Sequence, residues 1–289
     1  FAGLNGSGKS NVLEALSTIF YHLEICVARY LPESIKNPEN FKREICTPDA
    51  FTLEYLIGQS SLEIYTLEHL HKVTITKKIG EEPVMEIQEF PFDSSVKKIP
   101  IELKSKLGSE QSAPGKSYLP DHVIGYSSGE NEILSLPFIK SRLIHLDEFK
   151  QQTEKGEKEF TGSENSLIYI NNSMSQAVLL SCLLMENEKT LAPIRDVNNT
   201  GIIGLKSFRM NINLLHFKFQ QDSSDNILKI LEQKEIEKLK KCATSWYSND
   251  KTLWLDFYIT DETKEAFKFH FNHDSFELFQ FFRLLYELN

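Results

Sequence analysis

The sequence predicts an α/β fold in which a glycine-rich turn leads into a helix, an antiparallel β-subdomain follows, and an α+β accessory region is inserted after it. Three patterns indicate this. Gly3, Gly6 and Gly8 precede apolar residues at helical spacing, short runs between residues 51 and 87 alternate as strands do, and the second half mixes both patterns. We therefore expect one domain over residues 1–149 and the accessory region over residues 150–289.

The opening stretch carries the pattern of a phosphate-binding loop. Residues 3–10 read Gly-Leu-Asn-Gly-Ser-Gly-Lys-Ser, which matches G-x-x-x-x-G-K-[ST], the P-loop. The glycines let backbone N–H groups approach phosphate oxygens, Lys9 is long enough to reach the β- and γ-phosphates, and the Ser10 hydroxyl is the expected Mg²⁺ ligand. The helix that follows favours an anion at its N-terminus. The pattern predicts a site for ATP and Mg²⁺ formed by Asn5, Gly6, Ser7, Gly8, Lys9, Ser10 and Asn11.

The residues around this loop narrow the class of ATPase. Residues 5–11, followed by Leu-Glu-Ala-Leu at residues 13–16, resemble the Walker A loop of ABC-type ATPases of the SMC, RecF and OLD group. The resemblance implies a P-loop NTPase with an ABC/SMC-like head. In such proteins two heads enclose ATP, with the Walker A loop of one facing the signature motif of the other, and head closure acts on DNA or on a bound nuclease.

The composition is that of a globular protein with enough apolar material for a core, since 40% of the residues are hydrophobic and 25% are charged. The chain has no apolar run of about 18 residues and no signal peptide, so no membrane segment is predicted. The four cysteines are far apart and form no CxxC pair, which favours a reducing cytoplasm. The net charge of −9 means that any contact with DNA needs a local basic patch.

Four strand-like runs follow the first helix, which we expect to end near Tyr30. The runs cover residues 51–57, 62–65, 73–76 and 84–87, and they resemble the antiparallel β-subdomain of ABC-type heads. Between the first two lies Gln59, which is either a Q-loop glutamine that senses Mg²⁺ and the γ-phosphate or a polar residue in a turn. Residues 94–120 are rich in Lys, Ser, Gly and Pro, which predicts a loop.

Residues 127–130 read Ser-Ser-Gly-Glu, which resembles the ABC signature. In that family the equivalents of Ser128 and Gly129 contact the γ-phosphate held by the opposite head. The alternative is an ordinary helix N-cap, in which Ser127 or Ser128 caps the first turn. Glu130 or Asn131 would then support that turn.

A candidate Walker B follows at residues 143–148, which read Leu-Ile-His-Leu-Asp-Glu. Asp147 would hold Mg²⁺ and Glu148 would activate the attacking water, which makes Glu148 and Lys9 the candidate catalytic residues. The alternative is that these residues end the preceding helix, in which case the working Walker B lies beyond Asn289.

Residues 150–165 are charged and polar, which predicts a linker. Beyond it the spacing of apolar residues predicts alternating strands and helices. We expect strands at 167–170 and 202–219, helices at 173–186 and 227–241, a hairpin of residues 253–259 with 266–271, and a final helix from Ser275.

Three stretches together resemble one family in particular. Residues 5–11, 126–137 and 173–180 are similar to the restriction-system-associated AAA/ABC-type ATPases, the PtuA-like subunits of Septu and retron anti-phage defence systems. The resemblance implies an ATPase that controls an HNH nuclease, the PtuB-like partner, and that forms a homodimer or higher oligomer through its heads. A retron reverse transcriptase and its RNA–DNA product are further implied partners. Since only two residues precede Gly3, we expect a fragment whose second signature and full Walker B follow Asn289.

Two other functions stay open at this point. One is an SMC- or RecF-like head that repairs or clamps DNA without a nuclease partner, and long heptad arms outside this chain would favour it. The other is a binding module in which ATP is structural and is never hydrolysed. The second predicts that Lys9→Ala harms assembly while wild-type turnover is undetectable.

Overall fold

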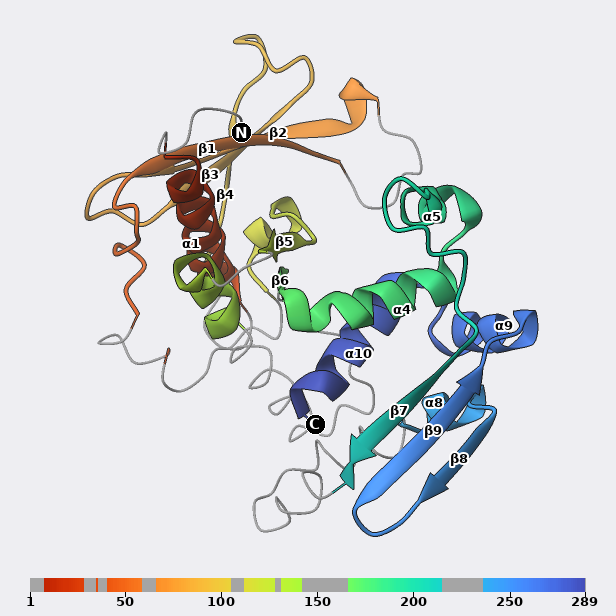
Figure 1. Cartoon of the computed structure of the whole chain (residues 1–289). Coiled ribbons are helices and arrows are strands. Elements are labelled where there is room, and N and C mark those ends of the chain that lie inside the picture. Colours follow the sequence, from red (N-terminus) through yellow and green to blue (C-terminus); the bar gives the residue numbers. More distant parts are fainter. Residues whose placement is uncertain are drawn as a thin grey trace. The chain divides into compact units, whose positions relative to one another are not determined.

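A computed structural model of the 289-residue chain describes residues 8–28, 35, 41–58, 66–104, 112–127, 131–141, 166–214 and 236–288. Contacts within the chain divide it into two units, Phe1–Ile170 and Asn171–Asn289 (Figure 1). The boundary expected after residue 149 falls within residues 142–165, which lie outside the described residues. Among the described helices, none combines the length and the hydropathy that a membrane crossing requires.

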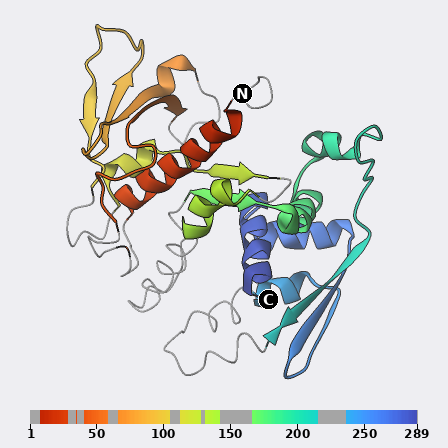
Figure 2. The same ribbon diagram turned by 60° about the vertical axis from the view of Figure 1, so that its left-hand side comes forward.

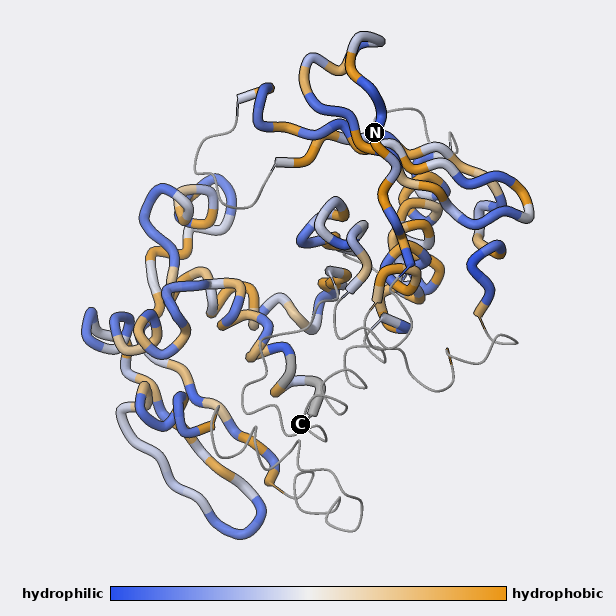
Figure 3. The backbone as a smooth tube through the Cα atoms, turned by 180° about the vertical axis from the view of Figure 1, so that it is seen from behind, coloured by the Kyte–Doolittle hydropathy of each residue, from blue (hydrophilic) through white to orange (hydrophobic). Residues whose placement is uncertain are grey.

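Helix α1 (Lys9–Val27) is the centre of the first unit, and it ends three residues before the predicted limit. Its second half is mostly apolar, with His22 and Glu24 as exceptions (Figure 3). Ile19, Leu23 and Val27 are buried and recur every four residues, so they share one face. At the end of the helix the Cys26 carbonyl, which has no partner within the helix, accepts a hydrogen bond from Arg43 Nη2 at 2.8 Å.

An antiparallel sheet packs against this helix. Its strands are β1 (Phe51–Gly58), β2 (Leu70–Lys77), β3 (Val84–Glu89) and β4 (Ile99–Ile101), in the order β1-β2-β3-β4. The predictions for residues 51–57, 73–76 and 84–87 are confirmed, whereas residues 62–65 lie outside the described residues. Strand β4 lies in the stretch expected to be a loop, and it adds to the sheet by pairing with β3.

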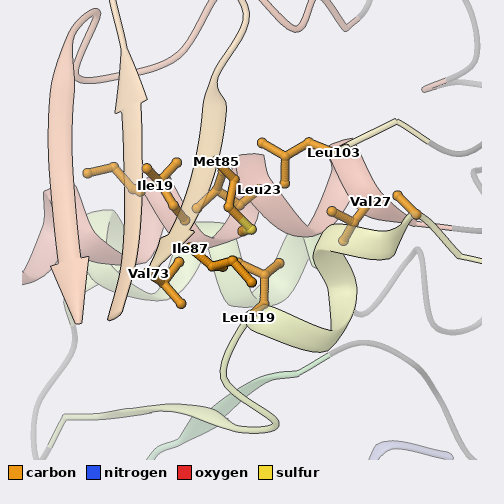
Figure 4. Packing of buried hydrophobic residues seen from close by; sticks show 10 residues of the cluster. Ile19, Leu23, Val27, Val73, Met85, Ile87, Leu103 and Leu119 are labelled. Atoms are coloured by element: carbon orange, nitrogen blue, oxygen red, sulfur yellow. The ribbon is translucent and has the colours of Figure 1, made fainter. Parts of the chain in front are cut away.

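The core of this unit joins the apolar face of α1 to one face of the sheet (Figure 4). Each large side chain buried there contributes about 1.5–3 kcal/mol of stability relative to an exposed one. The 3₁₀ turn η2 (Pro114–Tyr118) closes the cluster, because Ala113 N–H donates to the Val27 carbonyl at 3.2 Å. The buried members include Ile19, Leu23, Val27, Val73, Ile75, Met85, Ile87, Leu103, Ala113 and Leu119.

Two parallel strands lie beside α1, β5 (Val123–Tyr126) and β6 (Leu167–Ile170). The strand at residues 167–170 was predicted, and β5 was not. A helix over residues 132–141 packs on the pair, and its Phe138 ring lies against Gly125. A Cβ on Gly125 would lie 2.5 Å from that ring, so the close approach of the helix requires glycine.

A buried lysine fixes the loop between α1 and β1. Lys77 is 2% exposed, and its ammonium donates to the carbonyls of Glu44, Asp49 and Lys78 at 2.7, 3.0 and 3.2 Å. All three donors of the ammonium group therefore have an acceptor. The same loop provides the Arg43 carbonyl that lies 3.0 Å from His22 Nε2 of α1.

Acid is expected to destabilise this unit through His22. The pKa of His22 is lowered from 6.5 to about 4, mainly by burial; the hydrogen bond with the Arg43 carbonyl acts in the opposite direction, and the positive charges of Lys77 and Arg43 add to the lowering. Between these two values the unfolded chain binds a proton that the folded chain does not, so stability falls as the pH falls from about 6.5 to about 4. The loss over that window is about 3 kcal/mol.

Urea unfolding followed by far-ultraviolet circular dichroism across this pH range measures the effect. His22→Gln keeps a hydrogen-bond donor without a titrating ring, so its stability should depend less on pH than that of the wild type. His69→Gln, at an exposed position, is the control and should keep the wild-type slope. Equal slopes in all three proteins would contradict the assignment.

The second unit joins a small sheet to helices. The strands β7 (Ser207–Asn213), β9 (Thr252–Tyr258) and β8 (Ser245–Ser248) pair antiparallel in that order. The predicted helix at 173–186 and the final helix from Ser275 are confirmed; of the predicted helix at 227–241, the described part begins at Ile236. The elements are η3 (Asn172–Met174), α4 (Ser175–Met185), α5 (Glu188–Arg195), β7 (Ser207–Asn213), α8 (Ile236–Cys242), β8 (Ser245–Ser248), β9 (Thr252–Tyr258), α9 (Asp261–His270) and α10 (Ser275–Leu288).

The predicted hairpin of residues 253–259 with 266–271 is wrong, because most of the second run lies in helix α9. The Thr260 side chain caps the helix by accepting a hydrogen bond from Thr263 N–H at 3.3 Å, and acidic residues occupy the first turn. Phe267 and Phe271, four residues apart, stack with centroids 6.1 Å apart. Phe269 between them is 73% exposed, so the alternation of phenylalanines is not a strand pattern.

Candidate nucleotide-binding site

The candidate site is centred on the beginning of α1. Gly8 has φ +81° and precedes the first helical residue, Lys9, and Val12 N–H donates to the Gly8 carbonyl at 3.2 Å. Only glycine adopts this left-handed conformation without steric cost, which explains why glycine stands directly before the helix. The remaining residues of the predicted loop, Asn5, Gly6 and Ser7, lie outside the described residues.

The first turn of α1 is exposed, in contrast to its second half. Ser10 and Asn11 are exposed, as are Val12 and Leu13 at 40% and 46%. No acidic residue lies in this turn. The first N–H groups of a helix have no acceptor within it, and its dipole is positive at this end, so an anion is stabilised there. The exposure and the charge of this turn are both compatible with a bound phosphate.

The two parallel strands have a defined direction relative to α1. Ser166, directly before β6, donates a hydrogen bond to Glu24 near the end of α1, and Tyr21 packs against the cluster formed with Leu167. The two strands therefore begin beside the last part of α1 and run back along it, with their carboxyl ends toward its beginning (Figure 2). In open parallel sheets ligands bind outside the carboxyl ends of the strands.

Glu24 connects three segments that are far apart in the sequence. Its carboxylate accepts hydrogen bonds from Lys116 Nζ at 2.9 and 2.7 Å and from the Ser166 hydroxyl. Glu24 is 5% exposed. The ion pair with Lys116 joins α1 to η2, and the hydrogen bond from Ser166 joins α1 to the start of β6. Sequence reasoning missed these contacts, because Lys116 is 92 positions and Ser166 is 142 positions from Glu24, and no local pattern links residues that far apart.

The signature-like segment differs in part from expectation. Asn131 caps the helix at residues 132–141 by accepting a hydrogen bond from Leu134 N–H at 3.0 Å. Ser127, considered as the cap, instead continues the strand ladder, since its N–H donates to the Ile170 carbonyl at 3.3 Å. Ser128 and Gly129 lie outside the described residues, and their proposed contact with a γ-phosphate stays a prediction.

The remaining candidates also fall outside the described residues. Gln59 directly follows β1, and Asp147 and Glu148 belong to residues 142–165. Among the residues that the structure does describe, no group of three or more His, Cys, Asp or Glu side chains is arranged to hold a metal ion. Ser10 stays the candidate ligand for Mg²⁺.

Cys26, in the last turn of α1 and so at the other end of the helix from the candidate site, is not a reactive group. Burial raises the pKa of the Cys26 thiol to about 12, although the charge of Arg43 acts in the opposite direction. The thiol is fully buried and stays protonated at neutral pH. Cys26 therefore belongs to the core of the first unit.

Comparison with family models, with curated proteins and with solved structures gives no significant match for this chain.

Proposed function

We propose that this chain binds ATP with Mg²⁺ at residues 5–11, and that it is the ATP-binding subunit of a bacterial anti-phage defence complex that controls an HNH nuclease. One structural observation supports the nucleotide site. Helix α1 begins directly after a left-handed glycine, and its exposed first turn carries Lys9 and Ser10 and no acidic residue. The defence role is supported by the resemblance of residues 5–11, 126–137 and 173–180 to the PtuA-like ATPases.

In this proposal each residue at the beginning of α1 has a distinct role. The backbone N–H groups of the first turn and the Lys9 ammonium bind and neutralise the β- and γ-phosphates. The Ser10 hydroxyl holds Mg²⁺, which neutralises the charge on the phosphates. A second copy of the chain closes over the nucleotide, and nucleotide state then restrains or releases the nuclease.

Binding and hydrolysis of ATP by the purified chain, alone and with the protein encoded by the adjacent gene, test the proposal. A fluorescent ATP analogue measures binding and released phosphate measures turnover. We expect the chain to bind ATP only in the presence of Mg²⁺. We also expect the rate at which the two proteins together cleave DNA to depend on the nucleotide that is bound. Absence of nucleotide binding in both preparations would contradict the central proposal.

The same experiment separates the alternatives. Binding without turnover would favour a structural ATP, so that the nuclease would respond to loss of nucleotide. DNA retained by the chain without any nuclease partner would favour an SMC- or RecF-like clamp.

A further inference from the structure

The sheet of the second unit has one covered face and one open face. Along β9, Leu253, Leu255 and Phe257 are at most 1% exposed, whereas the alternate residues are partly or fully exposed. The covered face packs against aromatic side chains, with Phe257 stacked on Phe208 at 4.4 Å and near Phe267 of α9 at 5.5 Å. In Figure 1 α8 lies behind the sheet, so the viewer looks at the other face.

We call this other side of the sheet the open face. Strand pairing places its residues in rows across the three strands, with successive rows about 7 Å apart along β9. In the part of the chain that the structure describes, no residue of these rows is buried. From one end to the other, the rows are Asn213 and Thr252; Asn211, Trp254 and Tyr247; Arg209, Asp256 and Ser245; and Ser207 with Tyr258.

Aromatic rings are prominent on the open face. Tyr247 and Trp254 lie opposite each other on neighbouring strands and stack with centroids 5.4 Å apart and planes 24° apart. Tyr247 is 63% exposed, and Tyr258, four residues beyond Trp254 on β9, is 53% exposed. Large aromatic side chains bury much surface in a core, so three of them directed outward on one face indicate a ligand with flat apolar groups.

The guanidinium group of Arg209 lies between the aromatic residues and is held in place by an ion pair. Arg209 Nε and Nη2 bind the two carboxylate oxygens of Asp256 at 2.5 and 2.8 Å. The pair neutralises Asp256 and fixes the position of the guanidinium, a planar group that can stack on a base as the rings do. An open pocket of about 360 Å³ lies over this pair and is bordered by Thr244 and Tyr258.

The charge of this region is opposite to that of the whole chain. The strands of the sheet and the residues beside them, 206–213 and 244–258, carry three Lys and Arg and two Asp and Glu, whereas the chain has a net charge of −9. Lys206 and Lys251 are exposed beside the ends of β7 and β9. Lys240, whose ammonium lies 4.6 Å from the centroid of the Trp246 ring, belongs to α8 on the covered side of the sheet. A local positive excess around stacking rings suits a polyanion that carries flat bases.

We propose that the open face binds single-stranded nucleic acid, with bases stacking on Trp254, Tyr247 and Tyr258 and the phosphate backbone following the lysines around the sheet. Single strands rather than duplexes are the ligand, because a duplex keeps its bases stacked on each other and offers no free base face to a side chain. This site is independent of the proposed ATP site.

Fluorescence anisotropy of labelled oligonucleotides of one mixed sequence tests the proposal, with DNA single strand, RNA single strand and DNA duplex compared. We expect the wild type to bind single strands more tightly than duplex, and affinity to fall as salt increases. Trp254→Ala should weaken single-strand binding about 10- to 100-fold, since stacking on one aromatic side chain supports about that ratio. Trp254→Phe should restore most of it. The DNA and RNA arms show which single strand is preferred.

Two controls keep the result specific. Phe269→Ala removes a ring that is 73% exposed on α9, outside the sheet, and should bind as the wild type does. Lys9→Ala should also leave single-strand binding unchanged, so failure of the ATP proposal and failure of this one are distinguishable. The chain has two tryptophans, one in β8 and one in β9, so quenching of wild-type tryptophan fluorescence is an independent readout.

Several outcomes would overturn the proposal. The proposal fails if the wild type does not bind single strands, if the wild type binds duplex and single strand equally, or if Trp254→Ala binds single strands as tightly as the wild type. If Trp254→Ala instead abolished association with the adjacent gene's protein and left nucleic-acid binding intact, the open face would be a protein interface and the proposal would be wrong.

Discussion

Lys9→Ala is expected to weaken the binding of ATP about 100- to 1,000-fold. The lysine ammonium makes charge-assisted hydrogen bonds to phosphate oxygens in this kind of loop, and each is worth about 1.5–3 kcal/mol. Losing contacts to both the β- and γ-phosphates, each near the lower end of this range, accounts for that ratio. Titration with a fluorescent ATP analogue measures it directly.

The matched control is Lys78→Ala, which removes a lysine whose side chain is 71% exposed, directly after β2. It should bind ATP with wild-type affinity. Lys9→Ala should also unfold in urea as the wild type does in the absence of nucleotide, since the first turn of α1 contributes little to the core. If Lys9→Ala bound ATP as tightly as the wild type, the loop at residues 5–11 would not be the nucleotide site.

Lys116→Met is expected to destabilise the first unit by about 3 kcal/mol. The Glu24 carboxylate, which is 5% exposed, then keeps the Ser166 hydroxyl and loses the Lys116 ammonium as a hydrogen-bond donor. The loss is at the lower end of the range for buried ion pairs because a fifth of the Lys116 side chain is exposed. Urea unfolding followed by circular dichroism measures the change.

A double-mutant cycle isolates the interaction. Glu24→Gln together with Lys116→Met removes both charges, so it should cost clearly less than the sum of the two single substitutions. Lys98→Met breaks an exposed pair with Glu86 at 3.5 Å and should change stability by less than about 1 kcal/mol. Additive single effects in the cycle would show that the two side chains do not stabilise each other.

The elements with a clear local pattern were predictable. The glycine before Lys9 has the left-handed conformation that the loop pattern implies, α1 follows it, and three runs of alternating residues form strands β1 to β3. These features depend on residues close in the sequence: the spacing of apolar side chains along an element and the conformational freedom of glycine.

Other elements had weak or misleading local patterns. Strand β8 is exposed at all four positions, so it has no apolar alternation to reveal it. Strand β5 reads Val-Ile-Gly-Tyr, and its glycine weakens the strand pattern, whereas β6, of the same length, is apolar throughout. The run at residues 266–271 has the alternation of a strand, yet the capping of α9 by Thr260 and the contact between Phe267 and Phe271 favour a helix.

By itself the sequence determined where phosphate is expected to bind, because a glycine-rich loop with a lysine and a serine is a local arrangement. Only the tertiary structure decided that β5 and β6 pair side by side with their carboxyl ends toward the beginning of α1, and that Glu24 meets Lys116 and Ser166. It alone also placed Tyr247 beside Trp254 on one open face. The physical reason is that strand pairing and burial of charge depend on contacts between residues distant in the chain, which periodicity within one segment does not encode.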